Sequence, residues 1–288
     1  MQIFKICSLF ALVAFLISVQ FVVAGKPNVK DGPLKKGQEM ADAKAAPLNE
    51  KRDGADGRPD PEWITKWLVP DGGYMANGGF QQSAPKDLID EATKGKLDQV
   101  TLSTYEGLLE ANRIGIDFPK KNHMKGAVGD FIVVEFEPAE AGGRNMSSRY
   151  GLPCQNNFDT YQIIVIDAPQ DMKAIMSPSQ DDHAQIWING EKWFNDSRWT
   201  GSPIEVDFDI EVKLKAGGNV LLYRCGESGG HDYANLHLDD KTMGKVKIYP
   251  DKAKKANAFF NEIAPAFGVA PKGKLPSVWG DVKSINNQ

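Results

Sequence analysis

The feature that most constrains the fold is an uninterrupted alternation of apolar and charged residues over positions 204–215, IEVDFDIEVKLK. Successive side chains of a β-strand point to opposite faces, so a period of two predicts a strand with one buried and one solvated face. The run is longer than a typical strand, and we expect a bend or a bulge to divide it. The chain therefore contains a sheet that faces a core on one side and water on the other.

Further β-rich runs lie on both sides of this stretch. Clusters of Gly, Pro and Asn separate these runs. The runs before the alternating stretch are DFIVVEFE, TYQIIVID and DMKAIMS, and those after it are VLLYRC, YANLHLD and KVKIYP. Strands at this density with glycine-rich turns predict a mainly β fold, an antiparallel β-sandwich. Residues 86–97 and 251–264 carry helix signals, so we expect a short helix or two outside the sheets.

The first 24 residues have the form of a secretory signal peptide. They contain one lysine, an apolar core at residues 6–23, and small or aliphatic residues before a cleavage point after Ala24. An uncleaved membrane anchor is the alternative, because about 18 apolar residues nearly span a bilayer. We expect cleavage, no membrane span afterwards, and a secreted protein with an extracellular, periplasmic or cell-surface location.

The mature chain is expected to divide into three parts. Residues 25–62 lack aromatic side chains and cannot bury enough apolar surface to offset their ordering entropy, which predicts a flexible linker. The sandwich domain is expected over residues 63–250, with its best support over 130–250, and residues 251–288 form a C-terminal helix and docking tail. The formal net charge of −4 gives no electrostatic reason to expect nucleic acid as a partner.

Two cysteines, Cys154 and Cys225, remain once the signal segment is removed. A disulfide between them would close a loop of about 70 residues and stabilise an exported protein by about 4 kcal/mol. Two reduced, buried thiols are the alternative. The sequence contains no CxxC or CxxCH motif, so a redox site, a c-type haem and a zinc ribbon have no support.

The segment SQDDHAQIWINGEKW, residues 179–193, combines an acidic pair with a hairpin signal. Asn-Gly at 189–190 predicts a two-residue type I′ turn, because that turn needs positive φ at both central positions. Such a turn fixes the register, and residues paired across it share a face. We therefore expect Ile186 and Trp193 together in the core, and Trp187 beside Lys192 on the other face, where it is accessible.

This segment, with the LKAGGNVLLYRCGESGG and YANLHLD runs that follow it, resembles the jelly-roll modules of secreted bacterial proteins. The resemblance covers about residues 160–240. It extends to the galactose-binding-like sandwiches found beside glycoside hydrolases and, more loosely, to PA14 modules. It implies a jelly-roll sandwich that binds carbohydrate without catalysis and often carries a structural calcium. His183 stands where the family has a glycine after its acidic pair.

The acidic pair itself permits three interpretations. Asp181 and Asp182 can cap their own turn, which needs no ligand. They can also bind calcium, which prefers carboxylate and carbonyl oxygens. The third interpretation is acid–base catalysis by Asp182 with His183, or by Asp232 with His231. Adjacent residues of a strand point to opposite faces, which argues against such neighbours cooperating.

Three loops, residues 177–183, 195–203 and 226–235, are expected to converge at one end of the sandwich. An aromatic ring that stacks on a sugar, with polar groups around it, is typical of carbohydrate sites. The candidate ligand-binding residues of these loops and of the hairpin are Trp187, Arg198, Trp199, His231, Asp232 and Tyr233.

We expect a secreted, non-catalytic protein that binds carbohydrate or another extracellular polymer. A structural envelope or extracellular-matrix protein that contacts other envelope proteins through the sandwich is the first alternative. A hydrolase or lyase with a cleft between residues 63–130 and the sandwich is the second. The sequence lacks the HExxH and P-loop motifs that would favour an enzyme.

Overall fold

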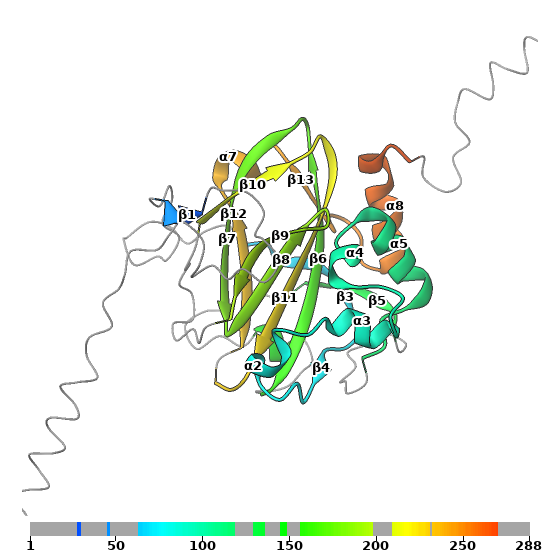
Figure 1. Ribbon diagram of the computed structural model, residues 1–288. Helices are drawn as coiled ribbons and strands as arrows, with labels where there is room; N and C mark the ends of the chain where they lie inside the picture. Colours follow the sequence, from blue (N-terminus) through cyan, green and yellow to red (C-terminus); the bar gives the residue numbers. More distant parts are fainter. Residues whose placement is uncertain are drawn as a thin grey trace, which may run out of the picture.

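Two facing β-sheets and a layer of helices make up the part of the chain that the computed structural model describes (Figure 1). The described residues are 63–118, 129–135, 145–148, 156–197, 209–230 and 232–269, together with the backbone of two short strands at 28–29 and 45–46. The predicted signal peptide, most of the predicted linker, and the tail beyond residue 269 lie outside these ranges.

The first sheet, sheet A, contains five strands in the order β12-β7-β10-β1-β2. Their bounds are β1 Asn28–Val29, β2 Ala45–Ala46, β7 Met172–Asp181, β10 Asp209–Leu214 and β12 Tyr233–Leu238. All pairs are antiparallel except the two-residue strand β1, which runs parallel to β10. Strand β10 is the part of the alternating run that the structure describes. Its Ile210, Val212 and Leu214 face the core, as the alternation predicts.

The second sheet, sheet B, has the order β5-β3-β6-β11-β8-β9, and β4 and β13 also pair with β6. Its strands are β3 Lys66–Pro70, β4 Tyr74–Met75, β5 Phe131–Glu135, β6 Phe158–Ala168, β8 His183–Ile188, β9 Glu191–Asp196, β11 Gly217–Glu227 and β13 Lys247–Tyr249. Every pair in this sheet is antiparallel. Sheet B packs against sheet A through a continuous apolar cluster. The prediction of a mainly β antiparallel sandwich is confirmed.

Helices cover the outer face of sheet B, where Figure 1 shows them gathered beside β3, β5 and β6. The helices of the described residues are α2 Phe80–Ser83, α3 Leu88–Thr93, α4 Gln99–Leu102, α5 Tyr105–Ile114, α6 Asn145–Ser148, α7 Asp240–Met243 and α8 Ala256–Ile263, followed by the 3₁₀ turn η2 Ala264–Phe267. No helix among the described residues is long and apolar enough to cross a membrane.

Local sequence explains how the helical layer is built. The side chain of Asp87 caps α3 by accepting hydrogen bonds from the backbone of Ile89 and Asp90, each at 3.0 Å. Thr104 caps α5 by accepting from Gly107 N at 3.1 Å. Gly107 also lets α5 approach α4, because a Cβ there would lie 1.8 Å from the carbonyl oxygen of Thr101. The layer is larger than the short helix or two that the sequence predicts.

The β8–β9 hairpin has the predicted turn but a different register beyond it. Asn189 and Gly190 have φ values of 51° and 84°, as a type I′ turn requires. Trp187 pairs with Lys192 as predicted, whereas Ile186 pairs with Phe194 instead of Trp193. Trp193 is therefore the extra residue of a β-bulge.

The expectation that Trp187 is accessible is wrong. Trp187 does lie on the face opposite the inter-sheet core, but that face is covered by the helices, and only 1% of the residue is exposed. The pattern indicates which face a residue occupies but not what covers that face. Trp193, by contrast, is buried with Ile186 in the inter-sheet core, as predicted.

Candidate functional site

The candidate site lies where the chain passes from sheet A into sheet B. Strand β7 ends at Asp181 and β8 begins at His183, so Asp182 alone joins the two strands. The peptide bond between Asp181 and Asp182 is cis. The end of β11 meets this corner, and the short helix α2 lies beside it (Figure 1). Strand β7 of sheet A and strands β8 and β11 of sheet B thus converge on the acidic pair.

Three carboxylates gather at this corner. Asp181, Asp182 and Glu227 each offer one oxygen, and these oxygens all lie within 4.8 Å of one another. The three residues are buried, with exposed fractions of 4%, 1% and 0%. We call these three residues the acidic corner. Two oxygens bound to one calcium ion at about 2.4 Å each are at most about 4.8 Å apart, so the spacing suits such an ion.

Glu227 has the least compensated carboxylate of the three. Neither of its carboxylate oxygens has a hydrogen-bond partner, although the residue is fully buried. Burial, together with the neighbouring Asp182 and Asp181 carboxylates, raises the pKa of Glu227 to about 9, against the opposing effect of the Gly229 backbone. A buried carboxyl without a partner needs a proton or a cation, and here the nearby oxygens provide a ligand set for a cation.

Polar side chains on the inner face of sheet B extend the acidic corner into the sandwich. Register pairs Glu227 with Phe158 and Cys225 with Thr160, so Thr160 and Gln162 of β6 share the inward face with Glu227. The hydroxyl oxygen of Thr160 and both amide atoms of Gln162 are buried without hydrogen-bond partners. This end of the inter-sheet space is therefore lined by oxygen and nitrogen atoms that no described side chain satisfies.

Backbone contacts hold the corner in place. The amide N of Asp182 donates to the carbonyl oxygen of Gly226 at 3.2 Å. The amide N of Ser228 donates to Oδ2 of Asp182, also at 3.2 Å. Asp182 is thus fixed to the end of β11, next to Glu227. The turn-capping interpretation of the acidic pair accounts for this contact but not for the bare carboxylate of Glu227.

A buried ion pair stands on the other face of sheet B behind the corner. Arg224 Nε donates to Asp159 Oδ1 at 3.0 Å, and both side chains are fully buried. The same guanidinium donates to the carbonyl oxygens of Lys86 and Ser83, each at 2.8 Å. Asn77 completes the group by donating to Asp159 Oδ2 at 2.7 Å and to the carbonyl oxygen of Glu227 at 3.4 Å. The strand ends that carry the acidic corner are therefore tied to the helical layer.

His183 has a structural role at the start of β8. Its Nδ1 lies 3.0 Å from the carbonyl oxygen of Asp196, which can only accept, so Nδ1 carries the proton. Burial, with the positive charge of Arg224, holds the pKa of His183 well below its usual value. The ring is neutral at physiological pH, which gives no support to its acting as an acid–base partner of Asp182.

The other predicted ligand-binding residues fall into two groups. Arg198, Trp199 and His231 lie outside the described residues. Asp232 and Tyr233 are fully buried: Asp232 accepts hydrogen bonds from the backbone and the hydroxyl of Ser147, and Tyr233 pairs with Asp181 in sheet A. Together with the burial of Trp187, this leaves no predicted aromatic residue accessible among the described ones.

The predicted disulfide is not formed at Cys225. Cys225 is a free, buried thiol, and its Sγ lies 3.6 Å from the carbonyl oxygen of Tyr233 and 3.8 Å from that of Asp181. Cys154 lies outside the described residues. The side chain of Cys225 faces the inter-sheet core, so a reduced thiol acts there as a small apolar residue.

Sequence reasoning missed Glu227 as a possible metal ligand. The signal that indicates its position is the period of two along β11, where Tyr223 and Cys225 face the core and Glu227 occupies the next inward position. A charged residue at an inward-facing position of a strand indicates a candidate site as strongly as the acidic pair does. The polar positions at 160 and 162 of β6 follow from the same reasoning.

The hydrolase or lyase alternative required a cleft between residues 63–130 and the sandwich. In the described part of this region, β3 and β4 belong to sheet B itself, and the helices pack on the sheet through an apolar cluster that includes Leu68, Leu108 and Trp187. A layer packed in this way leaves no room for a substrate along that cluster.

The chain has a loose structural neighbour among solved structures. No family model matches the chain, and no curated protein matches it. Among solved structures, the PA14 domain of the MpAFP antifreeze protein is similar at a TM-score of 0.30 and 10% sequence identity, covering 64% of this chain and 88% of that domain. The similarity of this chain to a PA14 domain is therefore loose.

Proposed function

We propose that this chain is a secreted, non-catalytic binding protein, in which a calcium ion at the acidic corner organises one end of the sandwich for recognition of carbohydrate or another extracellular polymer. The observation that carries the proposal is the buried, unpartnered carboxylate of Glu227 beside Asp181 and Asp182. Three carboxylates in one buried place repel one another, and a divalent cation removes that repulsion.

The ligand chemistry favours calcium among the common cations. All three side chains offer oxygen, and neither His183 nor Cys225 belongs to the cluster, so the donor set is hard. Calcium takes about six to eight oxygen ligands, more than three carboxylate groups supply with one oxygen each. The Thr160 hydroxyl and the Gln162 amide, on the same inward face, offer further oxygen atoms.

Calcium dependence of stability is the direct test. The melting temperature of the full chain is measured in EDTA and at increasing calcium, for the wild type and Glu227→Gln. We expect calcium to raise the wild-type melting temperature, because it binds the folded state only. Glu227→Gln replaces an unpaired acid by a neutral amide of the same shape, so it should raise the melting temperature in EDTA and lose most of the calcium response.

Asp240→Asn is the matched control, because the side chain of Asp240 is 80% exposed and does not belong to the acidic corner. It should keep the full calcium response. A wild-type melting temperature that is the same in EDTA and in calcium rules out the cation. A glycan-array screen with and without calcium tests the second half of the proposal, and failure to bind any glycan in calcium rules out carbohydrate recognition.

A further inference from the structure

The three carboxylates of the acidic corner leave most of the coordination sphere of a calcium ion unfilled. They offer one oxygen each within 4.8 Å of one another, whereas calcium takes about six to eight oxygen ligands. The three acids are at most 4% exposed, so bulk water has little access to the space between them. Further protein oxygens are therefore expected beside the corner.

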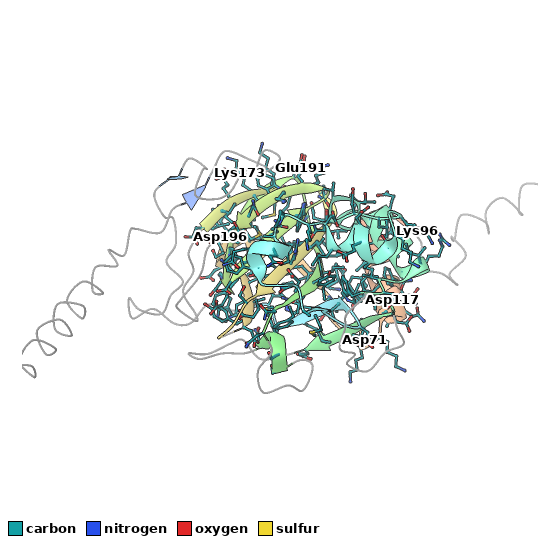
Figure 2. All side chains as sticks on the ribbon, turned by 60° about the horizontal axis from the view of Figure 1, so that its bottom comes forward. Asp71, Lys96, Asp117, Lys173, Glu191 and Asp196 are labelled. Carbon is teal, nitrogen blue, oxygen red and sulfur yellow. The ribbon has the colours of Figure 1, made fainter. Side chains whose placement is uncertain are left out.

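Other acids near this end of the sandwich are already compensated. Asp159 is held in its buried ion pair, and Asp232 accepts two hydrogen bonds from α6. Figure 2 turns this end of the sandwich toward the viewer and labels Asp196 of β9, whose carboxylate accepts from Gln180 Nε2 at 3.4 Å. A further ligand is therefore better supplied by a neutral oxygen than by one of these acids.

Thr160 of β6 has such an oxygen. Its hydroxyl is buried without a hydrogen-bond partner among the described residues, and the residue is 0% exposed. Its side chain faces the space between the sheets, because Ile164 and Ile166 of the same strand face that space and alternate positions share a face. A buried hydroxyl without a partner is unfavourable, and a cation beside it removes that cost.

The register of sheet B places Thr160 on the inward side of the corner. Thr160 is paired with Cys225, whose Sγ lies 3.8 Å from the carbonyl oxygen of Asp181. Glu227 is two positions further along β11, and such diagonal neighbours have Cβ atoms about 7–8 Å apart, within the reach of a long side chain. Burial, with the Glu227 and Asp181 carboxylates, raises the pKa of the Cys225 thiol well above its usual value, so both charges act at this position.

Gln162, the next inward position of β6, lies deeper and farther from the corner. It is paired with Tyr223, which is four positions, or about 13 Å of strand, from Glu227. Both polar atoms of its amide are buried without partners among the described residues, as the Thr160 hydroxyl is. Thr160 and Gln162 thus share burial and a lack of partners but differ in distance from the acids, so Gln162 provides a matched control.

We propose that the Thr160 hydroxyl is a fourth protein ligand of the cation at the acidic corner, and that this neutral oxygen favours calcium over magnesium. The inference rests on the function proposed above. Calcium accepts many oxygen ligands in a flexible geometry, whereas magnesium keeps several waters and is bound through one or two carboxylates. A buried site that replaces water by a hydroxyl oxygen therefore suits calcium.

Calorimetric titration of the EDTA-stripped full chain with calcium chloride, and separately with magnesium chloride, tests the proposal. Valine has the shape of threonine without the hydroxyl, so Thr160→Val should raise the melting temperature in EDTA. It should also weaken calcium binding about tenfold, and magnesium binding less. Thr160→Ser keeps the hydroxyl and should bind calcium as the wild type does.

Terbium in place of calcium reports the ligands directly, because its luminescence lifetimes in H₂O and D₂O give the number of bound waters. Thr160→Val should gain about one bound water relative to the wild type and Thr160→Ser, since water takes the place of the lost hydroxyl. The control variant Gln162→Met removes the deeper amide and should change neither the calcium Kd nor the number of bound waters.

The possible outcomes separate this inference from the cation proposal itself. A wild type that binds calcium together with a Thr160→Val variant of equal Kd overturns the ligand role and leaves the cation in place. Equal weakening by Gln162→Met also overturns it, and a calcium-to-magnesium ratio that Thr160→Val leaves unchanged overturns the selectivity. A wild type that binds no calcium overturns both proposals.

Discussion

Acidic residues in and behind the acidic corner differ in how their charge is compensated, although all are buried. Asp159 is paired with Arg224, and Asp182 accepts a hydrogen bond from Ser228 N. Glu227 has neither kind of partner. Its raised pKa means that the carboxyl is protonated at neutral pH when no cation is present. All three carboxyl groups are buried acids, and the candidate metal ligand differs from the structural ones in lacking a partner for its charge.

His183 provides a prediction at the same scale. Its pKa in the folded state is depressed, so the unfolded chain binds a proton that the folded protein does not. Stability from the neutral ring is therefore complete above the unfolded pKa of about 6.5 and is lost as the pH falls below that value. Urea unfolding between neutral pH and mildly acidic pH should show this loss in the wild type.

The variant His183→Asn isolates the effect of the imidazole. Its amide nitrogen takes the place of Nδ1 and can donate to the carbonyl oxygen of Asp196, but it does not titrate. The decline of the unfolding free energy below pH 6.5 should be shallower than in the wild type. An equally steep decline in both proteins would assign the acid sensitivity to other groups.

At the scale of secondary-structure elements, the hairpin shows what the sequence can and cannot predict. The Asn-Gly turn was predictable, because few residues adopt positive φ at two successive positions. The bulge was not, since β9 contains no glycine or proline to mark it, EKWFND. The accessibility of Trp187 was mispredicted because the helices that cover it come from residues about 80 positions earlier, a tertiary contact that no local pattern reveals.

The turn allows a direct test. Gly190→Ala places a Cβ on a residue with φ of 84°, and we expect a loss of about 1–2 kcal/mol in the free energy of unfolding. Gly229→Ala is the matched control: its φ is not positive, and a Cβ there would meet nothing closer than 3.9 Å. Denaturant titration compares the two. Equal losses would show that the positive φ of Gly190 is not what fixes the turn.

At the scale of the whole molecule, the sandwich and the helical layer form one packed body around sheet B. Two apolar clusters, one on each face of the sheet, hold it between sheet A and the helices. Arg224 adds a polar connection, because it contacts Asp159 on β6 and the carbonyl oxygens of Ser83 and Lys86 in the helical segment. The mainly β class was predictable from period-two patterns, whereas this third layer was not, because its helices are short and weakly periodic.

Arg224→Met should reveal how strongly this connection matters. Removing the guanidinium leaves Asp159 buried without its cation, and we expect the free energy of unfolding to fall by about 3–5 kcal/mol. The double variant Arg224→Met/Asp159→Asn removes both charges and should recover part of the loss. Denaturant titration of the wild type, both single variants and the double variant gives the coupling. Additive effects of the two substitutions would contradict the buried pair as the source of the loss.

The direct passage from β7 into β8 has a practical consequence for protein engineering. Asp182 is the only residue between β7 and β8, so there is no loop that could accommodate an insertion. An inserted peptide would force both sheets out of register. The turn at Gly229 offers the contrary case, since a Cβ there would meet no atom closer than 3.9 Å and its φ is not positive. A fluorescent or affinity tag grafted at Gly229, two residues from Glu227, would report on the acidic corner, whereas the same tag at Asp182 would destroy the fold that it was meant to observe.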